Sequence, residues 1–275
     1  MKNSHNIYLI SDSTGETLDR IFLALKAQFE NFNYKINQFS FTRTETQINK
    51  IIENAENEKN SIILYTIVNS KLAKYLTEET KRKKIPCFSV LGELILNFSK
   101  LLNQKASHEP SGQHVLNKEY YNRIEAIQFT MNHDDGNNIG DIDKSDIILL
   151  GVSRTSKTPT SIYLANRGFK TTNIPLVNEK SLPKKMTELT FNNCVVGLIT
   201  EANRLFDIRR NRLSSLKESD NKEYANINEI KKEIENSKKI FRKNSWPTID
   251  VTRKSVEETA ASIIKIYEIK NKKNG

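Results

Sequence analysis

The chain has 275 residues, which is enough for one large domain or two modest domains that each bury a core. Its 43 basic and 33 acidic side chains give a formal net charge of +10, but lysine is spread along the whole sequence, so this charge is weak support for a polyanionic partner and nucleic-acid binding is not expected. The two cysteines, Cys87 and Cys194, lie far apart in apolar segments, which excludes a disulfide framework and indicates a reducing compartment.

Neither a membrane segment nor a zinc site is expected. The amino terminus has no signal-peptide pattern, and no apolar run approaches membrane-spanning length. The sequence also lacks the CxxC and HExxH spacings that are typical of zinc ligands. The chain is therefore expected to be a soluble cytoplasmic protein.

The amino-terminal stretch predicts a strand, a glycine-containing loop and a helix. An apolar run at 7–10 leads into the loop Ser-Asp-Ser-Thr-Gly-Glu-Thr at 11–17. One helical face follows, with apolar residues at Leu18, Ile21, Phe22, Leu25, Phe29 and Phe32. The loop is a candidate anion site, but the acidic Asp12 and Glu16 argue against bare phosphate. Asp12 is better suited to act as a base, to bind a metal or to contact a hydroxyl group, and a plain loop of capping residues is the alternative.

Strands and helices continue to alternate up to about residue 105. Strands are predicted at 35–42, 61–68 and 85–90. A helix between the first two is expected to bury Ile48, Ile51, Ile52 and Ala55. Because such alternation indicates a parallel sheet with right-handed crossovers, residues 1–105 are expected to form a first α/β unit.

Residues 106–140 interrupt this alternation and are expected to connect two units. The segment 107–113 is typical of a linker or an active-site loop. The helix that follows carries one apolar side, formed by Tyr120, Tyr121, Ile124, Ile127 and Met131. It ends at a polar group made of His133, Asp134, Asp135 and Gly136. This group suits acid–base chemistry or a metal, and it equally suits a helix cap and turn, because Asp-Gly is a common turn pair.

The stretch from 146 to 163 predicts a phosphate-binding loop between a strand and a helix. The apolar run 147–150 is expected to be a strand buried on both faces, and Thr158 with Pro159 predicts a helix start. The spacing between them almost matches the Walker A pattern G-x-x-x-x-G-K-[ST]. In such a loop, backbone N–H groups and the positive end of the helix face an anion together.

Ser156 departs from this pattern, because it stands where Walker A has its second glycine. Serine reaches a positive φ at a greater cost than glycine does, so the usual loop shape is less strongly specified. The alternative is an ordinary turn with a capping threonine. That alternative leaves two loop cations, Arg154 and Lys157, without an explanation.

The remainder of the chain predicts a second α/β unit over 141–275. Strands are expected at 173–177, 195–200 and 248–252, and Ser255 with Glu258 predicts a capping box for the last helix. An arginine-rich helix follows the second of these strands, and its arginines suit either a phosphate clamp or a solvated face. A long amphipathic helix comes next, with apolar positions Tyr224, Ile227, Ile230, Ile234 and Phe241.

The expected fold class is therefore α/β. An amino-terminal parallel-sheet unit is followed by a P-loop-kinase-like α/β domain with a helical insertion.

Several segments together resemble the pyruvate, phosphate dikinase regulatory proteins. They are the loop at 11–17, the segment from Arg123 to Gly136, the loop at 151–160, and the pair formed by 249–252 and 255–258. These segments are spread over nearly the whole chain. Their joint occurrence is far more specific than any one of them alone.

The resemblance implies a bifunctional enzyme. As a kinase, the family uses ADP rather than ATP to phosphorylate a regulatory threonine beside the catalytic histidine of the dikinase, which inactivates the dikinase. In the opposite direction, the family removes this phosphate with inorganic phosphate as the acceptor and releases pyrophosphate. Ser156 resembles the dikinase branch, whereas the branch that regulates phosphoenolpyruvate synthase tends to have glycine at this position.

The resemblance also implies roles for particular residues. Lys157 and the loop N–H groups would hold the ADP phosphates, Thr158 would bind Mg²⁺, and Arg154 would neutralise developing charge. The whole ADP loop would consist of Gly151, Val152, Ser153, Arg154, Thr155, Ser156, Lys157 and Thr158. The candidates for the catalytic base are Asp12, His133, Asp134 and Asp135. A second anion pocket, for the acceptor phosphate, would use Arg204, Arg209 and Arg212.

Other functions stay open from the residues alone. One alternative is that the chain carries out the same chemistry on phosphoenolpyruvate synthase. A small-molecule P-loop kinase would explain the phosphate loop and the arginine-rich helix, but not the first α/β unit. A nucleotide-sensing module without catalysis is another alternative, whereas an RNA-binding protein is disfavoured because aromatic and basic residues are not clustered. The oligomeric state is open as well, a homodimer included.

Overall fold

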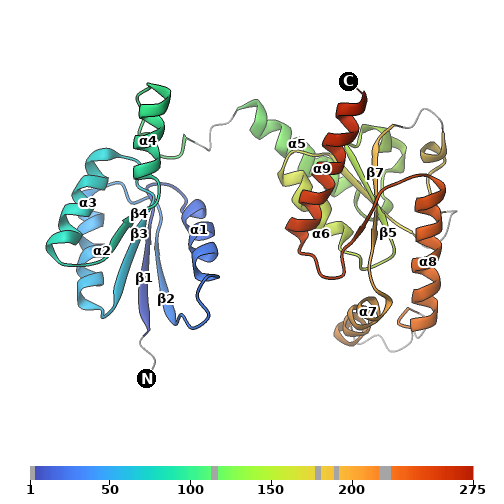
Figure 1. Ribbon diagram of the computed structural model, residues 1–275, viewed down its shortest axis with the longest axis horizontal. Helices are drawn as coiled ribbons and strands as arrows, with labels where there is room; N and C mark the ends of the chain where they lie inside the picture. The colour runs from blue at the N-terminus through green and yellow to red at the C-terminus, as the bar shows by residue number, and fades with distance from the viewer. Residues whose placement is uncertain (1–3, 113–116, 177–180, 189–191, 217–223, 275) are drawn as a thin grey trace. The chain divides into compact units, whose positions relative to one another are not determined.

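The computed structural model describes residues 4–112, 117–176, 181–188, 192–216 and 224–274 (Figure 1). The chain divides into two compact units, Met1–Val115 and Leu116–Gly275. The segment at 106–112 therefore belongs to the first unit, and the helix and polar turn that follow residue 116 belong to the second. Each unit contains one four-stranded parallel sheet, so the fold class is α/β, as predicted.

The first unit is a parallel sheet with helices on both faces. Its strands have the order β2-β1-β3-β4 and the bounds His5–Ile10 (β1), Tyr34–Phe39 (β2), Ser61–Tyr65 (β3) and Cys87–Ser89 (β4). Helix α1 (Glu16–Lys26) covers one face, whereas α2 (Glu45–Asn57) and α3 (Ser70–Arg82) cover the other (Figure 1). Ile7 and Leu9 of β1 face α1, while Tyr8 and Ile10 face the other two helices.

Helix α2 confirms the predicted apolar face, because Ile48, Ile51, Ile52 and Ala55 are all buried. Its amino end is closed by a capping box, in which the Thr44 side chain accepts from the Gln47 N–H and the Gln47 side chain accepts in return.

Helix α1 is shorter than its apolar pattern predicts. It ends at Lys26, so the expectation of one helical face extending to Phe32 was wrong. A helix of that length would leave a single residue to reverse the chain before β2 begins at Tyr34. Phe29 is exposed as a result, while Phe32 packs against the Phe22 and Tyr34 rings from outside the helix.

Helix α4 (Gly92–Leu102) follows β4, and the sequence patterns above assigned no element to it. None of its residues is buried. Its exposed large apolar side chains are Leu94, Leu96, Phe98, Leu101 and Leu102.

The second unit repeats the architecture with a different helical cover. Its strands have the order β6-β5-β7-β8 and the bounds Ile147–Gly151 (β5), Thr171–Pro175 (β6), Cys194–Ile199 (β7) and Thr248–Asp250 (β8). Helices α6 (Lys157–Asn166) and α9 (Val256–Asn274) pack on one face, and α8 (Ile227–Lys243) packs on the other (Figure 1). Every residue of β5 is buried, which confirms the strand predicted to lie between two helical layers.

Two further helices lie outside this repeat. Helix α5 (Lys118–Asn132) packs beside α6 and runs into the short 3₁₀ helices η2 (Asp134–Gly136) and η3 (Ile139–Lys144). Helix α7 (Ala202–Leu216) pairs with α8, and these two form the predicted helical insertion between β7 and β8. A third 3₁₀ helix, η5, spans Lys184–Thr187.

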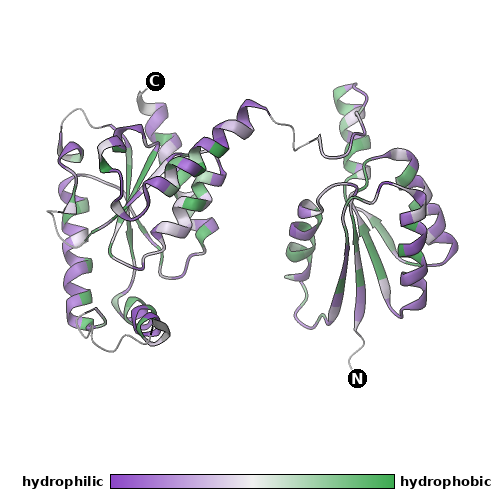
Figure 2. Cartoon of the chain, turned by 180° about the vertical axis from the view of Figure 1, so that it is seen from behind, coloured by the Kyte–Doolittle hydropathy of each residue, from purple (hydrophilic) through white to green (hydrophobic). Residues whose placement is uncertain are grey.

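The hydropathy of the chain follows these layers. Figure 2 shows hydrophobic residues along the strands of both sheets and hydrophilic residues on the outward faces of most helices. The predicted strand at 173–177 overlaps β6, although its last residue, Val177, lies outside the described residues. Within the described ranges, no helix combines the length and the low polarity needed to cross a bilayer.

Gly197 of β7 is needed where helix α8 approaches the sheet. A Cβ atom at this position would lie 2.6 Å from two carbons of the Phe241 ring. We therefore expect Gly197→Ala to destabilise the protein by about 1–3 kcal/mol, because the packed ring has to move. Denaturant unfolding of Gly140→Ala provides the control, since a Cβ there would meet no atom within 4 Å among the described residues. Equal stability of the two variants would contradict the prediction.

Candidate active site

The candidate site lies where strand β5 ends. The strands of a parallel sheet point the same way, so the loops after β5 and β7 and the end of β6 share one edge of the sheet. The chain leaves β5 at Gly151 and enters α6 at Lys157. A Cβ atom on Gly151 would lie 2.7 Å from both the Leu198 carbonyl oxygen and the Thr155 Oγ1. Only glycine therefore lets the loop leave the strand so close to β7.

The loop takes left-handed backbone conformations without the second glycine of Walker A. Arg154 has a φ of 72° and Ser156 a φ of 60°. Ser156 is the N-cap residue of α6, and none of the described side chains caps this helix end. The N–H groups of the first turn therefore face the loop with the positive end of the helix dipole, which is the arrangement that attracts anions.

Lys157 folds back into the loop. Its Nζ donates to the Val152 carbonyl at 3.0 Å, and Thr155 Oγ1 donates to the same carbonyl at 3.0 Å. The lysine is 6% exposed. Burial lowers its pKa from 10.5 to about 8, while the carboxylates of Asp135 and Asp134 act in the opposite direction. A phosphate oxygen would replace the carbonyl as a stronger partner for this ammonium group.

The polar turn after α5 meets this loop through Asp134. Its Oδ1 accepts from Thr158 Oγ1 at 3.0 Å and from the Asn173 side-chain amide. Asn173 belongs to β6, is fully buried, and also donates to Ser161 Oγ at 3.2 Å. Its amide oxygen accepts from the Asp135 N–H at 3.1 Å. One asparagine thus holds the carboxylate of Asp134 and the backbone of Asp135 beside the loop at 151–158.

Asp135 differs from its neighbour because its carboxylate makes none of the hydrogen bonds described for this part of the chain. The residue is exposed and has a φ of 53°, an uncommon backbone conformation for a residue with a side chain. Its charge raises the pKa of Lys157, against the larger effect of burial. An unengaged carboxylate close to a buried ammonium group suits proton transfer.

His133 lies in the helix cap rather than at the loop. Its ring is 5% exposed and stacks on Phe129 with centroids 3.8 Å apart. Nδ1 lies 2.8 Å from the Phe129 carbonyl, so this nitrogen carries the proton and donates. Among the described atoms, Nε2 is buried without a partner. These contacts hold the start of the polar turn in place, and none of them joins the ring to Lys157 or Thr158.

Arg209 of α7 connects the helical insertion to the loop at 151–158. Its guanidinium is 1% exposed and forms a two-pronged ion pair with Glu233 of α8, at 2.6 and 3.2 Å. The same group donates to the Ser153 carbonyl at 3.3 Å. Arg209 is therefore engaged inside the protein, in contrast to the anion pocket expected for it, whereas Arg204 and Arg212 are exposed.

Tyr224 lies at the junction of the insertion and the loop. Its hydroxyl accepts from Arg154 Nε at 3.2 Å and lies 3.3 Å from Ser153 Oγ. The Arg209 guanidinium packs over the ring at 4.7 Å from the centroid. Burial raises the pKa of the Tyr224 phenol, but the hydrogen bonds to Ser153 and Arg154 outweigh it, so the pKa is lowered.

Asp12, the remaining predicted candidate, belongs to the first unit. Its Oδ2 accepts from the Val68 N–H at 2.8 Å and from the Asn69 N–H at 3.4 Å. The carboxylate thereby joins the loop after β1 to the loop after β3. All the other predicted site residues lie in the second unit.

The residues present suit Mg²⁺ better than a metal held by protein ligands alone. Within the described residues, no group of three or more His, Cys, Asp or Glu side chains could hold a metal. Thr158 and Asp134 offer one hydroxyl and one carboxylate at the loop 151–158. Mg²⁺ is commonly held by one or two such groups, with substrate phosphates and waters completing the shell.

Comparison with known proteins identifies the family. The model of the kinase/pyrophosphorylase family matches residues 7–264. The chain belongs to the kinase/pyrophosphorylase family. A protein of Pelagibacter ubique (strain HTCC1062) is 68% identical over 275 residues, which cover 100% of each chain. A protein of Anaplasma marginale (strain Florida) is 43% identical over 273 residues, covering 98% of this chain and 96% of the relative. Both carry the provisional name of pyruvate, phosphate dikinase regulatory protein.

Among the solved structures, the maleate cis-trans isomerase C194S mutant of Nocardia farcinica was matched. It aligns over 97% of this chain and 94% of its own, with 10% identity and a TM-score of 0.25. A likeness this weak carries no argument.

Two residues of this candidate site were missed by the sequence patterns. Asn173 carried little signal, since it was only the first residue of the strand predicted at 173–177, and the structure places it in the middle of β6. Tyr224 carried no signal of a role in the site. Its spacing assigned it to the apolar face of a helix, whereas in the structure it lies before α8 begins. Its contact with Arg154 spans 70 residues of sequence.

For a loop that binds ADP, the pKa of Lys157 predicts how the ADP affinity depends on pH. The protonated lysine attracts phosphate, and burial lowers its pKa to about 8, so affinity is expected to fall as the pH rises above about 8. The decrease approaches about tenfold per pH unit, the limit for loss of one proton. Titration calorimetry between about pH 7 and about pH 9.5 measures this decrease in affinity, because that range includes the Lys157 pKa of about 8.

Two variants make this test specific. Lys157→Ala should bind ADP weakly with little pH dependence over that range. Tyr224→Phe removes the other nearby group with a shifted pKa and should keep the pH dependence. A pH dependence that persists in Lys157→Ala would contradict the assignment.

Proposed function

We propose that this chain is an ADP-dependent protein kinase that phosphorylates a threonine of pyruvate, phosphate dikinase, and that it also removes this phosphate with inorganic phosphate. The names of its relatives and the family description support this assignment. The observation that carries it is the contact between Asp134 and Thr158, because it brings a pair of carboxylates to a phosphate-binding loop.

The loop would hold the two ADP phosphates. Lys157 and the N–H groups at the start of α6 offer the positive charge and the donors, and Arg154 lies at the outer side of the loop. Thr158 and Asp134 would hold Mg²⁺, which supplies charge neutralisation between the phosphates when bound. Asn173 and the Arg209–Glu233 pair would keep these groups in place.

In the kinase direction, Asp135 would be the general base. The threonine hydroxyl attacks the β-phosphorus of ADP, the bond between this phosphorus and the α,β-bridging oxygen breaks, and AMP leaves. Asp135 takes the hydroxyl proton. Its exposed, unengaged carboxylate supports this role over Asp134, whose Oδ1 is held by two donors.

In the opposite direction, an oxygen of inorganic phosphate attacks the phosphorus of phosphothreonine. The bond from phosphorus to the threonine oxygen breaks, a P–O–P bond forms, and pyrophosphate leaves. The threonine oxygen needs a proton, which Asp135 in its protonated form would return. Arg204 and Arg212 remain available for the acceptor phosphate, because they are exposed and lie on the same helix as the engaged Arg209.

A two-step labelling experiment tests this function. The chain is incubated with β-labelled ADP and purified dikinase, and inorganic phosphate is then added. We expect the label to appear on a dikinase threonine, identified by mass spectrometry, and then to leave as pyrophosphate. Lys157→Ala should abolish both steps, while Lys144→Ala, an exposed lysine of η3, should leave them intact. Transfer from ATP alone, or the absence of labelled threonine, would refute the proposal.

Asp135→Asn tests the base. Turnover in the kinase direction should fall by about 10²–10⁴-fold, because the proton acceptor is lost. The substitution also removes a charge that raises the pKa of Lys157, so that pKa falls below about 8 in the variant. ADP affinity is therefore compared at mildly acidic pH, where the lysine stays protonated, and it should change little there. Asp141→Asn is the matched control, because this carboxylate is exposed in η3 and pairs only with Lys144 among the described residues. Unchanged turnover in Asp135→Asn would exclude this base.

A further inference from the structure

Arg154 is an exposed cation whose guanidinium is held through its inner nitrogen. The residue lies in the loop at 151–158 with a φ of 72°, and its Nε donates to the Tyr224 hydroxyl at 3.2 Å. In the described part of the chain, the terminal nitrogens of this guanidinium have no hydrogen-bond partner. Their N–H groups are therefore left for a ligand, and a guanidinium binds a phosphoryl group through parallel bonds from such groups.

Tyr224 is a firm support for this arginine, because Arg209 holds it in two ways. The Arg209 guanidinium packs over the Tyr224 ring at 4.7 Å from the centroid, and Arg209 Nη1 donates to the Tyr224 backbone carbonyl at 3.1 Å. Arg209 is itself buried and paired with Glu233 of α8. Both the ring and the backbone of Tyr224 are thus attached to the buried part of the helical insertion.

The partners of the Tyr224 hydroxyl determine its hydrogen-bond roles. Arg154 Nε is a donor only, so the phenolic oxygen accepts from it. The phenolic proton is then available for Ser153 Oγ, which lies 3.3 Å away. One hydroxyl therefore connects the side chains of two successive loop residues to the insertion.

This support matters because a long, exposed arginine side chain samples many rotamers. Holding such a side chain in one orientation costs conformational entropy. In this protein the Tyr224 hydroxyl restricts Arg154 before any ligand binds. A charge that is already in place stabilises a transition state more effectively than one that must first be ordered.

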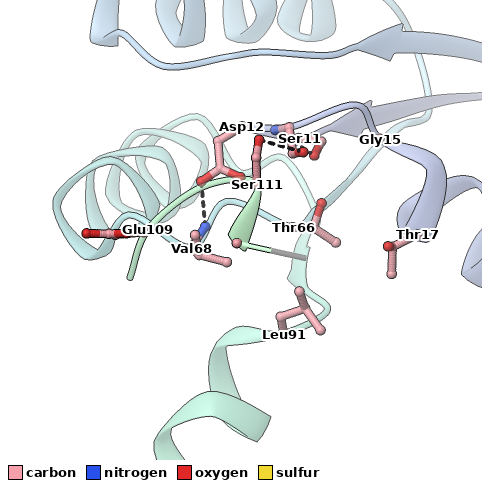
Figure 3. A pocket seen from close by; sticks show the side chains of 11 residues that line it. Ser11, Asp12, Gly15, Thr17, Thr66, Val68, Leu91, Glu109 and Ser111 are labelled. Carbon is pink, nitrogen blue, oxygen red and sulfur yellow. Dashed lines mark hydrogen bonds between the residues drawn. The ribbon is translucent and has the colours of Figure 1, made fainter. Parts of the chain in front are cut away.

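The first unit shows that a loop between a strand and a helix forms without such a pair. Figure 3 shows the described residues that line the pocket beside the loop after β1, and they include neither tyrosine nor arginine. The nearby Arg43 donates from Nε to the Asp12 carbonyl and from Nη2 to Ser111 Oγ, so the protein itself engages this guanidinium. The unengaged terminal nitrogens of Arg154 are therefore a feature of the second unit.

We propose that Tyr224 is a positioning residue for phosphoryl transfer, which holds Arg154 so that its terminal N–H groups meet the phosphoryl group as charge develops on it. This inference rests on the proposed function and deepens it. Tyr224 acts through Arg154 rather than on the phosphates themselves. Its contribution therefore belongs to the transition state, and the binding of ADP depends on Lys157 and the loop N–H groups instead.

Tyr224→Phe in the full chain tests the proposal in the assay with β-labelled ADP and dikinase. The substitution removes the hydroxyl and keeps the ring on which Arg209 packs. We expect kcat of the kinase direction to fall by at least about tenfold, the effect of losing one hydrogen bond to a charged group. ADP affinity should change little, and denaturant unfolding establishes that the variant is folded.

Tyr163→Phe is the matched control. The Tyr163 hydroxyl accepts from Arg167 Nη2 at 3.1 Å, and this guanidinium packs over the ring at 5.5 Å from the centroid. The same kind of tyrosine–arginine pair is thus broken on α6, away from the loop at 151–158. Turnover of this variant should equal that of the original chain.

A double-mutant cycle separates positioning from a merely structural role. Because Tyr224 acts through Arg154, adding Tyr224→Phe to Arg154→Gln should cause no further loss of turnover. NMR relaxation of the Arg154 Nε–H group in the free protein gives a second readout. This group should be ordered in the original chain and mobile in Tyr224→Phe.

The possible failures can be distinguished. Absence of label transfer by the original chain would overturn the proposed function, and this inference with it. If the original chain transfers label, unchanged turnover in Tyr224→Phe or an equal loss in Tyr163→Phe would overturn the positioning role alone. Losses that multiply in the double variant, or an Arg154 Nε–H group that stays ordered without the hydroxyl, would do the same.

Discussion

The hydrogen bonds that Asn173 makes with two successive aspartates constrain the whole candidate site. The polar turn after α5 is built from residues with no apolar contribution to the core, so packing alone does not fix it. Asn173 accepts from the backbone of one aspartate and donates to the carboxylate of the other. Because the asparagine is buried in β6, the turn takes its position from the sheet. The loop at 151–158 takes its position from the neighbouring strand β5, so both halves of the candidate site share one rigid support.

The helical insertion is joined to this support from the opposite side. Arg209 and Glu233 bring α7 and α8 together, and the same guanidinium reaches the backbone of the loop. A buried ion pair adds little net stability compared with apolar packing, but leaving either charge alone is costly, about 3–5 kcal/mol. The pair therefore specifies where the insertion lies relative to the loop, rather than serving as a source of stability. Its position explains why an arginine expected to meet phosphate is instead engaged by a carboxylate.

The spacing of apolar residues predicted most strands and helices well, because each type of element has its own repeat along the chain. The run of four apolar residues before Gly151 identified β5, and the spacing to Lys157 identified the loop after it. The same reasoning overextended α1, since apolar periodicity does not register that the chain has to turn before β2. It gave no sign that α4 would expose its apolar residues, because exposure depends on neighbours from elsewhere in the chain.

The site was predictable only as separate parts. The carboxylates and the loop were both identified as candidates, but the bond from Thr158 to Asp134 spans 24 residues and the bond from Asn173 to Asp134 spans 39. Such contacts follow from the order of the strands in the sheet. The sequence patterns predict each strand but do not say which strands are neighbours. The partners of His133 and Arg209 depend on the same arrangement. From residue type alone, His133 and Arg209 could not be distinguished from the other candidate site residues.

The left-handed conformation of Ser156 has a consequence for the entropy of ligand capture. A serine in this conformation costs more than a glycine, by roughly 1–2 kcal/mol. In exchange, its side chain narrows the range of backbone conformations that the segment samples before any ligand arrives. A segment that is already ordered loses less freedom when an anion binds, so more of the interaction energy remains as affinity. The residue that weakens the match to Walker A would thereby make the loop a stiffer receptor for the proposed ADP.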